Sequence, residues 1–456
     1  MGTKLFGTDG VRGVANKYPM TAEFALKLAL AAGVLVCRDK RKVAIGRDTR
    51  ISGEMLEAAL TAGFVSQGVD VVRLGVLPTP ALTTLTPELG VDMSVMITAS
   101  HNPYHDNGIK LIAADGSKFS DEVTSRLEDL TENGKFDNLP TEIGKITSDE
   151  NCIGRYIAKV RSAVPEGKPL KGLRVVLDCA NGVFSAILPR MFMELGAGVI
   201  AIGNEPDGCN INKDCGSQHI EKMTETVVGS HAQLGIAVDG DGDRIIICDE
   251  KGNRLDGDQI IAFLGKYCVE NKLLKGGSVV ATIVSNPALD RFLETIGVRC
   301  VRSGVGERYV IDEMKKHGSN LGGEESGHMV LSDYAKTGDS MVAALVVSMG
   351  LLNSGKKMSE IFPLFEPMFK KRVDSRFETK KQMEEAFELK AFKEAAEAAE
   401  KLIEGKGRIL VRKSGTEPKI QVWAWSDDPD FAAEVGRNMT SVLEKAPGFE
   451  SQKAVP

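Results

Sequence analysis

Apolar and polar positions follow two periods along the first 150 residues. Residues 21–36 carry apolar side chains at helical spacing, and Thr21 before them predicts an N-cap, with Glu23 close behind. A second helix is predicted to begin near Ser52. Short apolar runs that predict buried strands lie at 41–48, 69–75 and 93–100. Strands alternating with helices are typical of an α/β layer with a parallel or mixed sheet.

The same pattern restarts twice. Residues 173–203 and 276–303 each contain an apolar strand, a small polar loop, an amphipathic helix and a second strand. Residues 363–381, rich in charge, Pro and Phe, predict a linker, and an Ala/Glu/Lys-rich helix is predicted at 382–404. Two strand-like runs and a final helix follow, at 408–415, 419–425 and 428–446.

These elements predict an α/β protein made of three repeated α/β domains with mixed sheets and a smaller C-terminal α+β domain. The chain has 456 residues, which is too long for one ordinary hydrophobic core. The predicted domains are 1–150, with a serine-bearing loop, 151–252, 253–367 and the C-terminal 368–456.

Composition narrows the class of function. The formal net charge is −6 and there is no basic stripe, which argues against nucleic-acid binding, although a local pocket for a small anion is compatible. Eight cysteines form no CxxC pair and several lie in apolar runs, which predicts free thiols in a reducing, cytoplasmic setting. No signal peptide or membrane span is predicted, so no membrane partner is expected.

The segment TASHNPYHDNGIK, residues 98–110, is the first candidate for chemistry. An apolar strand ends there, and Ser100 and His101 enter a loop closed by Pro103 and a DNG turn. This is where α/β sheets bind ligands. Because a serine is a weak nucleophile without a base, a metal or a modification, a plain turn remains an equal alternative for these residues alone.

A second candidate is the loop in GIAVDGDGDRIIICDE, residues 235–250. Asp239, Asp241 and Asp243 are separated by single glycines, and three carboxylates this close repel one another unless a cation neutralises them. Oxygen ligands favour Mg²⁺ or Ca²⁺. An EF-hand is excluded because its sixth position requires Gly and here holds Arg244. The sequence therefore predicts a magnesium site, with a solvated acidic hairpin as the alternative.

Three further segments have chemical potential. RKSGTEP offers a concave anion site with Arg412, Ser414, Gly415 and Thr416, or else a surface turn. GGEESGH offers Glu324 and Ser326 as acceptors for sugar hydroxyls, and His328 as an acid or base or as a structural histidine. In FGTDGVRG, Arg12 suits either a phosphate clamp or a salt bridge.

Taken together, the ordered motifs resemble the α-D-phosphohexomutase superfamily, and within it the bacterial phosphoglucosamine mutases. They are FGTDGVRG, GRDTRISG, LGVLPTPAL, TASHNPYHDNGIK, DGDGDR, VGERYV, GGEESGH and RKSGTEP, covering residues 4 to about 425. The resemblance implies four domains around a central cleft, a homodimer and a cytoplasmic enzyme.

The resemblance also implies roles for the candidate residues. Ser100 would be phosphorylated, and an oxygen of that phosphate would bind one Mg²⁺ together with Asp239, Asp241 and Asp243. The other roles it implies are a catalytic set of His101, Lys110, Arg12, Arg244 and His328; sugar contacts from Glu324 and Ser326; and a site for the distal phosphate at Arg412, Ser414, Gly415 and Thr416.

The implied function is interconversion of glucosamine 6-phosphate and glucosamine 1-phosphate through a bound sugar 1,6-bisphosphate. Three places depart from the family pattern: Glu307 replaces the usual Asp, 336–340 reads KTGDS, and Lys419-Ile420-Gln421 replaces an apolar residue, Ile and Arg. These departures leave open a phosphomannomutase/phosphoglucomutase. A non-catalytic protein that binds phosphosugars or divalent cations is the alternative from another class.

Overall fold

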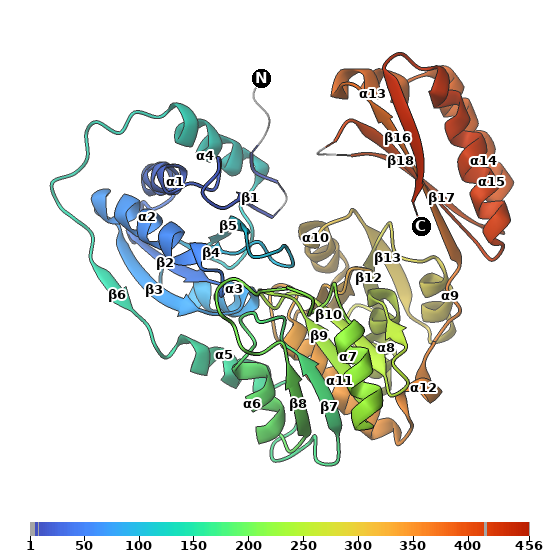
Figure 1. The fold of residues 1–456 in the computed structure, drawn as a ribbon, viewed down its shortest axis with the longest axis horizontal. Helices are drawn as coiled ribbons and strands as arrows, with labels where there is room; N and C mark the ends of the chain where they lie inside the picture. Colours follow the sequence, from blue (N-terminus) through green and yellow to red (C-terminus); the bar gives the residue numbers. More distant parts are fainter. Residues whose placement is uncertain (1–4, 8, 415–416, 456) are drawn as a thin grey trace.

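The computed structural model describes residues 5–7, 9–414 and 417–455. Four sheets follow one another along the chain, and the first three lie together while the fourth projects to one side (Figure 1). The first three sheets are mixed and the fourth is antiparallel throughout. The predicted fold class, three α/β units and a C-terminal α+β unit, is confirmed.

The first sheet has the order β1-β5-β4-β2-β3-β6. Thr21 caps α1 as predicted, because its hydroxyl accepts a hydrogen bond from the Phe24 amide at 3.1 Å. The strands are β1 Val11–Val14, β2 Lys42–Arg47, β3 Asp70–Val76, β4 Met93–Ile97, β5 Asp106–Ala113 and β6 Ile146–Ser148. The helices are α1 Ala22–Leu35, α2 Ser52–Ser66, α3 Thr79–Leu85, the 3₁₀ turn η1 Thr86–Glu88 and α4 Asp121–Asn133.

The second sheet has the order β11-β10-β9-β7-β8 and the third β13-β12-β14-β15. The strands of the second are β7 Arg174–Asp178, β8 Gly198–Ile202, β9 Leu234–Val238, β10 Ile245–Asp249 and β11 Arg254–Leu255. Those of the third are β12 Ser278–Thr282, β13 Arg299–Ser303, β14 Leu321–Gly323 and β15 Met329–Leu331. The accompanying helices are α5 Cys152–Arg161, α6 Ile187–Glu194, α7 Glu221–Ser230, α8 Gly257–Glu270, α9 Ala288–Thr295, α10 Glu307–His317, α11 Ser340–Ser354 and α12 Met358–Ile361.

One connection recurs in all three α/β units. In each, the loop after one parallel strand leads into an antiparallel neighbour: β4 to β5, β9 to β10, and β14 to β15. The strand orders β5-β4-β2-β3, β10-β9-β7-β8 and β15-β14-β12-β13 correspond. The three candidate loops, with Ser100, with the aspartates and with GGEESGH, therefore occupy equivalent places in three copies of one topology.

The C-terminal sheet has the order β17-β18-β16-β19. Its elements are β16 Phe369–Phe377, α13 Lys380–Phe387, α14 Lys390–Ile403, β17 Gly407–Lys413, β18 Lys419–Ser426, α15 Pro429–Thr440, the 3₁₀ turn η2 Ser441–Lys445 and β19 Phe449–Val455. Two predictions were wrong here. The predicted linker 363–381 contains β16, which lies in the interior of the sheet, and the predicted helix 382–404 is two helices.

The reason for the missed strand is visible in its side chains. Val373, Ser375 and Phe377 of β16 are buried at a spacing of two, on the side where α13 and α15 pack. Arg372 and Asp374 alternate with them and lie on the opposite face. The many charged residues of this segment concealed the alternation of buried and charged side chains that is typical of a strand.

Candidate active site

Ser100 lies in the loop after β4, fully buried, and its hydroxyl donates a hydrogen bond to Asp239 at 2.7 Å. Its backbone is left-handed, with φ at 54°, and its amide donates to the Thr98 hydroxyl at 2.9 Å. The loops from the first and second α/β units thus meet at this hydroxyl. The prediction that Ser100 and the aspartate loop belong to one site fits this geometry.

The aspartate loop is bound tightly to its own backbone. One carboxylate oxygen of Asp239 accepts hydrogen bonds from the amides of Gly242, Asp243 and Arg244, each at 3.1 Å. Gly242 has a φ of 79°, which a residue with a side chain rarely adopts. The loop is also joined to its neighbours, because the Thr79 amide donates to the Asp241 carbonyl at 3.0 Å.

All three aspartates are buried, and their ligand atoms lie within 4.8 Å of one another. Burial and then the charges of Asp243 and Asp241 raise the pKa of Asp239. In the described part of the chain, Oδ1 of Asp241 and Oδ1 of Asp243 accept no hydrogen bond. Buried carboxylate oxygens without donors are costly, and a divalent cation is the group that satisfies all of them at once. The residues therefore fit a divalent metal.

Lys110 of β5 provides the positive charge beside the aspartates. Its ammonium lies 2.8 Å from Asp241, 3.3 Å from Asp243 and 3.2 Å from Asp9. Burial alone would lower the pKa of Lys110, but the charges of these three carboxylates outweigh it and raise that pKa. Lys110 is therefore charged in this arrangement.

His101 and two arginines border the same loop. Nη1 of Arg244 donates to Nδ1 of His101 at 2.7 Å, and Arg12 reaches the Ala99 carbonyl at 3.4 Å. Burial, and then the charges of Arg244 and Arg12, lower the pKa of His101 to about 4. The imidazole is thus neutral at pH 7 and lies among cations, a setting that suits an anion such as a phosphoryl group.

The GGEESGH loop joins the metal loop through its backbone. The Ile245 amide donates to the Gly327 carbonyl at 2.9 Å, and Arg244 pairs with His328 as an isolated β-bridge. Glu324 accepts from the Gly306 amide at 3.0 Å, and Ser326 is exposed. The third unit therefore contacts the second unit at the metal loop.

His328 is buried between two carboxylates, at 3.8 Å from Asp243 and 3.0 Å from Glu307. Burial opposes a charge on the ring, but the charges of Glu307 and then Asp243 prevail and raise the pKa of His328 to about 9. A charged imidazole enclosed in this way favours a positioning role over the predicted proton transfer.

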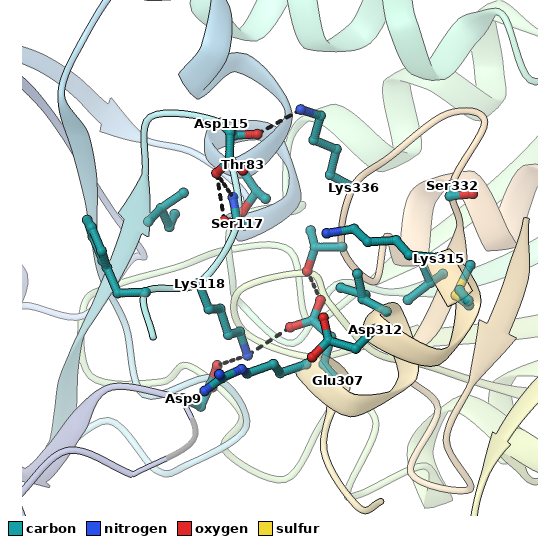
Figure 2. Close-up of a pocket in the computed structure, with 18 of the residues that line it drawn as sticks. Asp9, Thr83, Asp115, Ser117, Lys118, Glu307, Asp312, Lys315, Ser332 and Lys336 are labelled. Carbon is teal, nitrogen blue, oxygen red and sulfur yellow. Dashed lines mark hydrogen bonds and ion pairs between the residues drawn. The ribbon is translucent and has the colours of Figure 1, made fainter. Parts of the chain in front are cut away.

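A chain of charges behind this site was not predicted. Lys118 lies between Asp9 and Glu307, at 2.8 Å from each, and Glu307 also accepts from the Gly338 amide at 3.0 Å and from the Thr337 hydroxyl (Figure 2). These residues border a cavity of about 590 Å³ between the first and third units. Glu307, where the sequence departs from the family pattern, thus contacts His328, and His328 in turn lies beside Asp243 of the metal loop.

The structure also assigns a support to the Ser100 loop that motif inspection missed. Arg50, fully buried, is paired with Asp48 at 2.9 Å and donates to the carbonyls of Ser100 at 3.0 Å and Asn102 at 2.7 Å. The side-chain amide of Asn212 also donates to the Ser100 carbonyl, at 2.8 Å. The sequence marked this region only through the family motif GRDTRISG, and that motif did not show which of its residues supports the site.

The comparisons with known proteins agree with this architecture. Four domain families described as phosphoglucomutase/phosphomannomutase match in order: alpha/beta/alpha domain I at residues 3–138, domain II at 154–252, domain III at 256–368 and the C-terminal domain at 373–439. Together they cover most of the chain. The chain belongs to the phosphoglucomutase/phosphomannomutase family.

Relatives in this family are similar over nearly their whole length. A phosphoglucosamine mutase of Rhodospirillum rubrum is 47% identical over 446 residues, covering 97% of this chain and 98% of the relative. A phosphoglucosamine mutase of Sphingopyxis alaskensis is 48% identical over 443 residues, with coverage of 97% and 98%. The resemblance drawn from the motifs is confirmed.

Solved structures of the family share the fold. A phosphoglucomutase/phosphomannomutase family protein of Burkholderia thailandensis gives a TM-score of 0.81 at 20% identity, covering 99% of both chains. A putative phosphomannomutase of Thermus thermophilus gives 0.74 at 19% identity, covering 97% of this chain and 100% of the other.

The residues predicted for the distal phosphate belong to the C-terminal unit of this family fold. Arg412 is the second-last residue of β17, and the Ser414 hydroxyl accepts from the Glu417 amide at 3.2 Å. Gly415 and Thr416, predicted for the same site, lie outside the described residues. Lys370 of β16 pairs with Glu325 of the GGEESGH loop, so this unit contacts the segment predicted to bind the sugar.

Two other predictions concern the chain as a whole. The eight cysteines are free thiols, six of them buried. Among the described residues, none of the helices combines the length and the apolar character that a membrane span requires.

Proposed function

We propose that the protein interconverts glucosamine 6-phosphate and glucosamine 1-phosphate by phosphoryl transfer from Ser100. The observation that carries the proposal is the 2.7 Å hydrogen bond between the buried Ser100 hydroxyl and Asp239 of the aspartate cluster. The glucosamine specificity draws support from relatives at 45–48% identity that are named phosphoglucosamine mutases. The domain boundaries near 150, 252 and 367, the homodimer and the cytoplasmic location remain predictions of the same proposal.

The metal of the proposal is Mg²⁺, bound by Asp239, Asp241 and Asp243 and by an oxygen of the phosphorylated Ser100. When bound, it supplies positive charge that stabilises the negative charge spread over a phosphoryl group in transfer. A compact site of three carboxylates that leaves positions for phosphate oxygens suits Mg²⁺ better than Ca²⁺.

The residues of the chain perform the remaining tasks. Lys110, Arg12 and Arg244 offer charged N–H groups to the phosphoryl oxygens, and Arg50 fixes the Ser100 loop through its carbonyls. In each half-reaction the P–O bond to one oxygen breaks as that to the other forms, Ser100 first donating to the sugar and then accepting from the bisphosphate. Glu324 and Ser326 would orient the sugar between these steps.

The test is a panel of glucosamine, glucose and mannose 6-phosphates with Mg²⁺ and a catalytic amount of the matching 1,6-bisphosphate. Site-mapped mass spectrometry would follow phosphate on Ser100. We expect faster turnover of glucosamine phosphate and a phosphorylated Ser100. Equal or faster turnover of the neutral sugars would overturn the specificity, and full activity without phosphate on Ser100 would overturn the mechanism.

A further inference from the structure

Two arginines from neighbouring strands share one tryptophan on a face of the C-terminal sheet. Arg372 of β16 lies directly opposite Trp423 of β18. Arg412 of β17 lies opposite Gln421, which is two residues before Trp423 on β18. Residues two apart on a strand share a face. The guanidinium carbons lie 5.2 Å and 5.7 Å from the centre of the Trp423 ring system. The ring therefore holds two positive charges close together.

The two charges are unequally compensated. Arg372 is bound by Asp374, which accepts from Nε and from Nη2, both at 2.6 Å. Neither hydrogen of Nη1 is used in that pair. No described residue gives Arg412 a carboxylate partner, and burial together with the charge of Arg372 lowers the pKa of Arg412. Two like charges held together with so little compensation form a site for an anion.

The position of Arg372 connects two predicted subsites. Arg412 leads into RKSGTEP, the segment predicted for the distal phosphate. Lys370, two residues before Arg372 on the same face, pairs with Glu325 in the segment predicted for the sugar. Arg372 thus lies between Arg412, which leads into the predicted phosphate segment, and Lys370, which contacts the predicted sugar segment. Opposite Asp374 lies the uncharged Gln421, and Lys419 of the same strand lies 3.4 Å from Asp374.

We propose that Arg372 is a second guanidinium for the distal, non-transferring phosphate of the substrate, and that Asp374 is its positioning residue. The inference rests on the proposed function for the identity of the phosphosugar. The Nε and Nη2 atoms of Arg372 remain on Asp374, while Nη1 and the guanidinium of Arg412 donate to the phosphate oxygens. Trp423 orients both groups in advance, which lowers the entropy lost on binding.

The chain carries its own probe of this site, because its two tryptophans are Trp423 and Trp425. Intrinsic fluorescence is titrated with inorganic phosphate and with glucosamine 6-phosphate at constant ionic strength. We expect a saturable change in the parent chain and a Kd at least about tenfold weaker in Arg372→Gln, as expected for the loss of a charged hydrogen bond. Lys371→Gln removes the same charge from an exposed neighbour on the other face and should leave the Kd within about twofold.

Two further variants guard against misfolding. Arg372→Lys keeps the charge but loses the fork, and should weaken the Kd by at least about threefold. Asp374→Asn should weaken it less than Arg372→Gln, because it frees the arginine without removing it. If circular dichroism shows Arg372→Gln unfolded, the lysine variant decides. An unchanged phosphate Kd in a folded Arg372 variant would overturn the inference.

The fluorescence measurement does not need catalysis, so the two proposals fail separately. If the parent chain shows no mutase activity while phosphate binding still depends on Arg372, only the proposed function is lost. If the mutase is active and Arg372→Gln leaves both the Kd and the KM for glucosamine 6-phosphate unchanged, only the role of Arg372 is lost.

Discussion

The two ends of the proposed substrate site are built in opposite ways. At Ser100, carboxylates and cations are buried, and loops from three α/β units bind one another through backbone hydrogen bonds. Around Trp423, Arg372 and Arg412 are partly exposed and come from a single sheet. The first region fixes a geometry for chemistry, whereas the second offers charge to whichever phosphate arrives.

This difference suits a reaction whose intermediate must turn around. In the proposed mechanism a bisphosphate presents each of its phosphates to Ser100 in turn, so the transferring end requires one strict geometry. The other end must accept either phosphate, and two guanidiniums on an aromatic ring are less selective than a closed cage. Among described contacts, the C-terminal unit meets the third unit through side chains such as Lys370 with Glu325 and Asn286 with the Met368 carbonyl at 2.9 Å.

The largest effect is expected at the end of the proposed site around Ser100, which we call the rigid end. Ser100→Ala removes the phosphoryl carrier and should lower kcat by at least about 10³-fold. Fluorescence titration with glucosamine 6-phosphate should still give a Kd within about threefold of the parent, because the distal site is untouched. Activity within tenfold of the parent would contradict covalent transfer.

Removal of the metal should have the next largest effect. Chelation is expected to reduce activity below about 1%, and added Mg²⁺ should restore it and raise the Tm, since a ligand at 100 times its Kd stabilises by about 2.7 kcal/mol. In Asp241→Asn the rise in Tm should be largely lost. Asp137→Asn, at an exposed position, is the matched control and should respond like the parent. An equal rise in Tm in both variants would place the metal elsewhere.

Much of the rigid end could be predicted from sequence, because its signals are local. Three aspartates separated by single glycines, Asp239, Asp241 and Asp243, indicate a cation, and the strand before Ser100 is apolar at every position but Ser94. Its support could not be predicted. Arg50 and Glu307 support the site through partners that are distant in the chain, and nothing near them in sequence shows burial.

The other end of the proposed site, around Trp423, was harder to predict from the sequence. Strand β16 looked like a linker because charge was weighed above the alternation of Val373, Ser375 and Phe377. The same charges are what the proposed anion site on this face requires. An active-site sheet that exposes cations therefore departs from the pattern by which a strand is recognised.

Glu307 tests how far the rigid end extends. Its carboxylate is buried beside Lys118 and His328, so Glu307→Gln should lower the free energy of unfolding by about 2 kcal/mol, read from chemical denaturation. Arg308→Gln, next in sequence, loses an exposed pair with Asp121 across the same boundary and should cost below about 1 kcal/mol. Equal losses in the two variants would show that Lys118 and Glu307 are no more than a surface pair.

The last effect is a pH dependence of stability, and it concerns the junction with the C-terminal unit. Asp258 accepts from the Asn286 amide at 2.7 Å, and burial, followed by the charge of Asp256, raises the pKa of Asp258 to about 7. Because the folded state holds this proton more tightly than the unfolded state, with its ordinary value of 3.8, stability from this group is full below about pH 4. It should fall as pH rises toward 7, by up to about 1.4 kcal/mol per unit.

Asp258→Asn should flatten that part of the pH profile of unfolding free energy. Asp430→Asn, at an exposed position in the C-terminal unit, is the control and should keep the slope of the parent. A parent profile without any decline between pH 4 and 7 would contradict the raised pKa.

The left-handed backbone of Ser100 limits which hydroxyl amino acid can serve here. A φ of 54° is tolerated by small polar side chains but is unfavourable for a β-branched one. Threonine, equally able to form a phosphate ester, would add a methyl group at the one torsion that the loop has already fixed, in a place with no exposed surface. For the proposed phosphate carrier, the main chain thus favours serine over threonine before nucleophilicity enters.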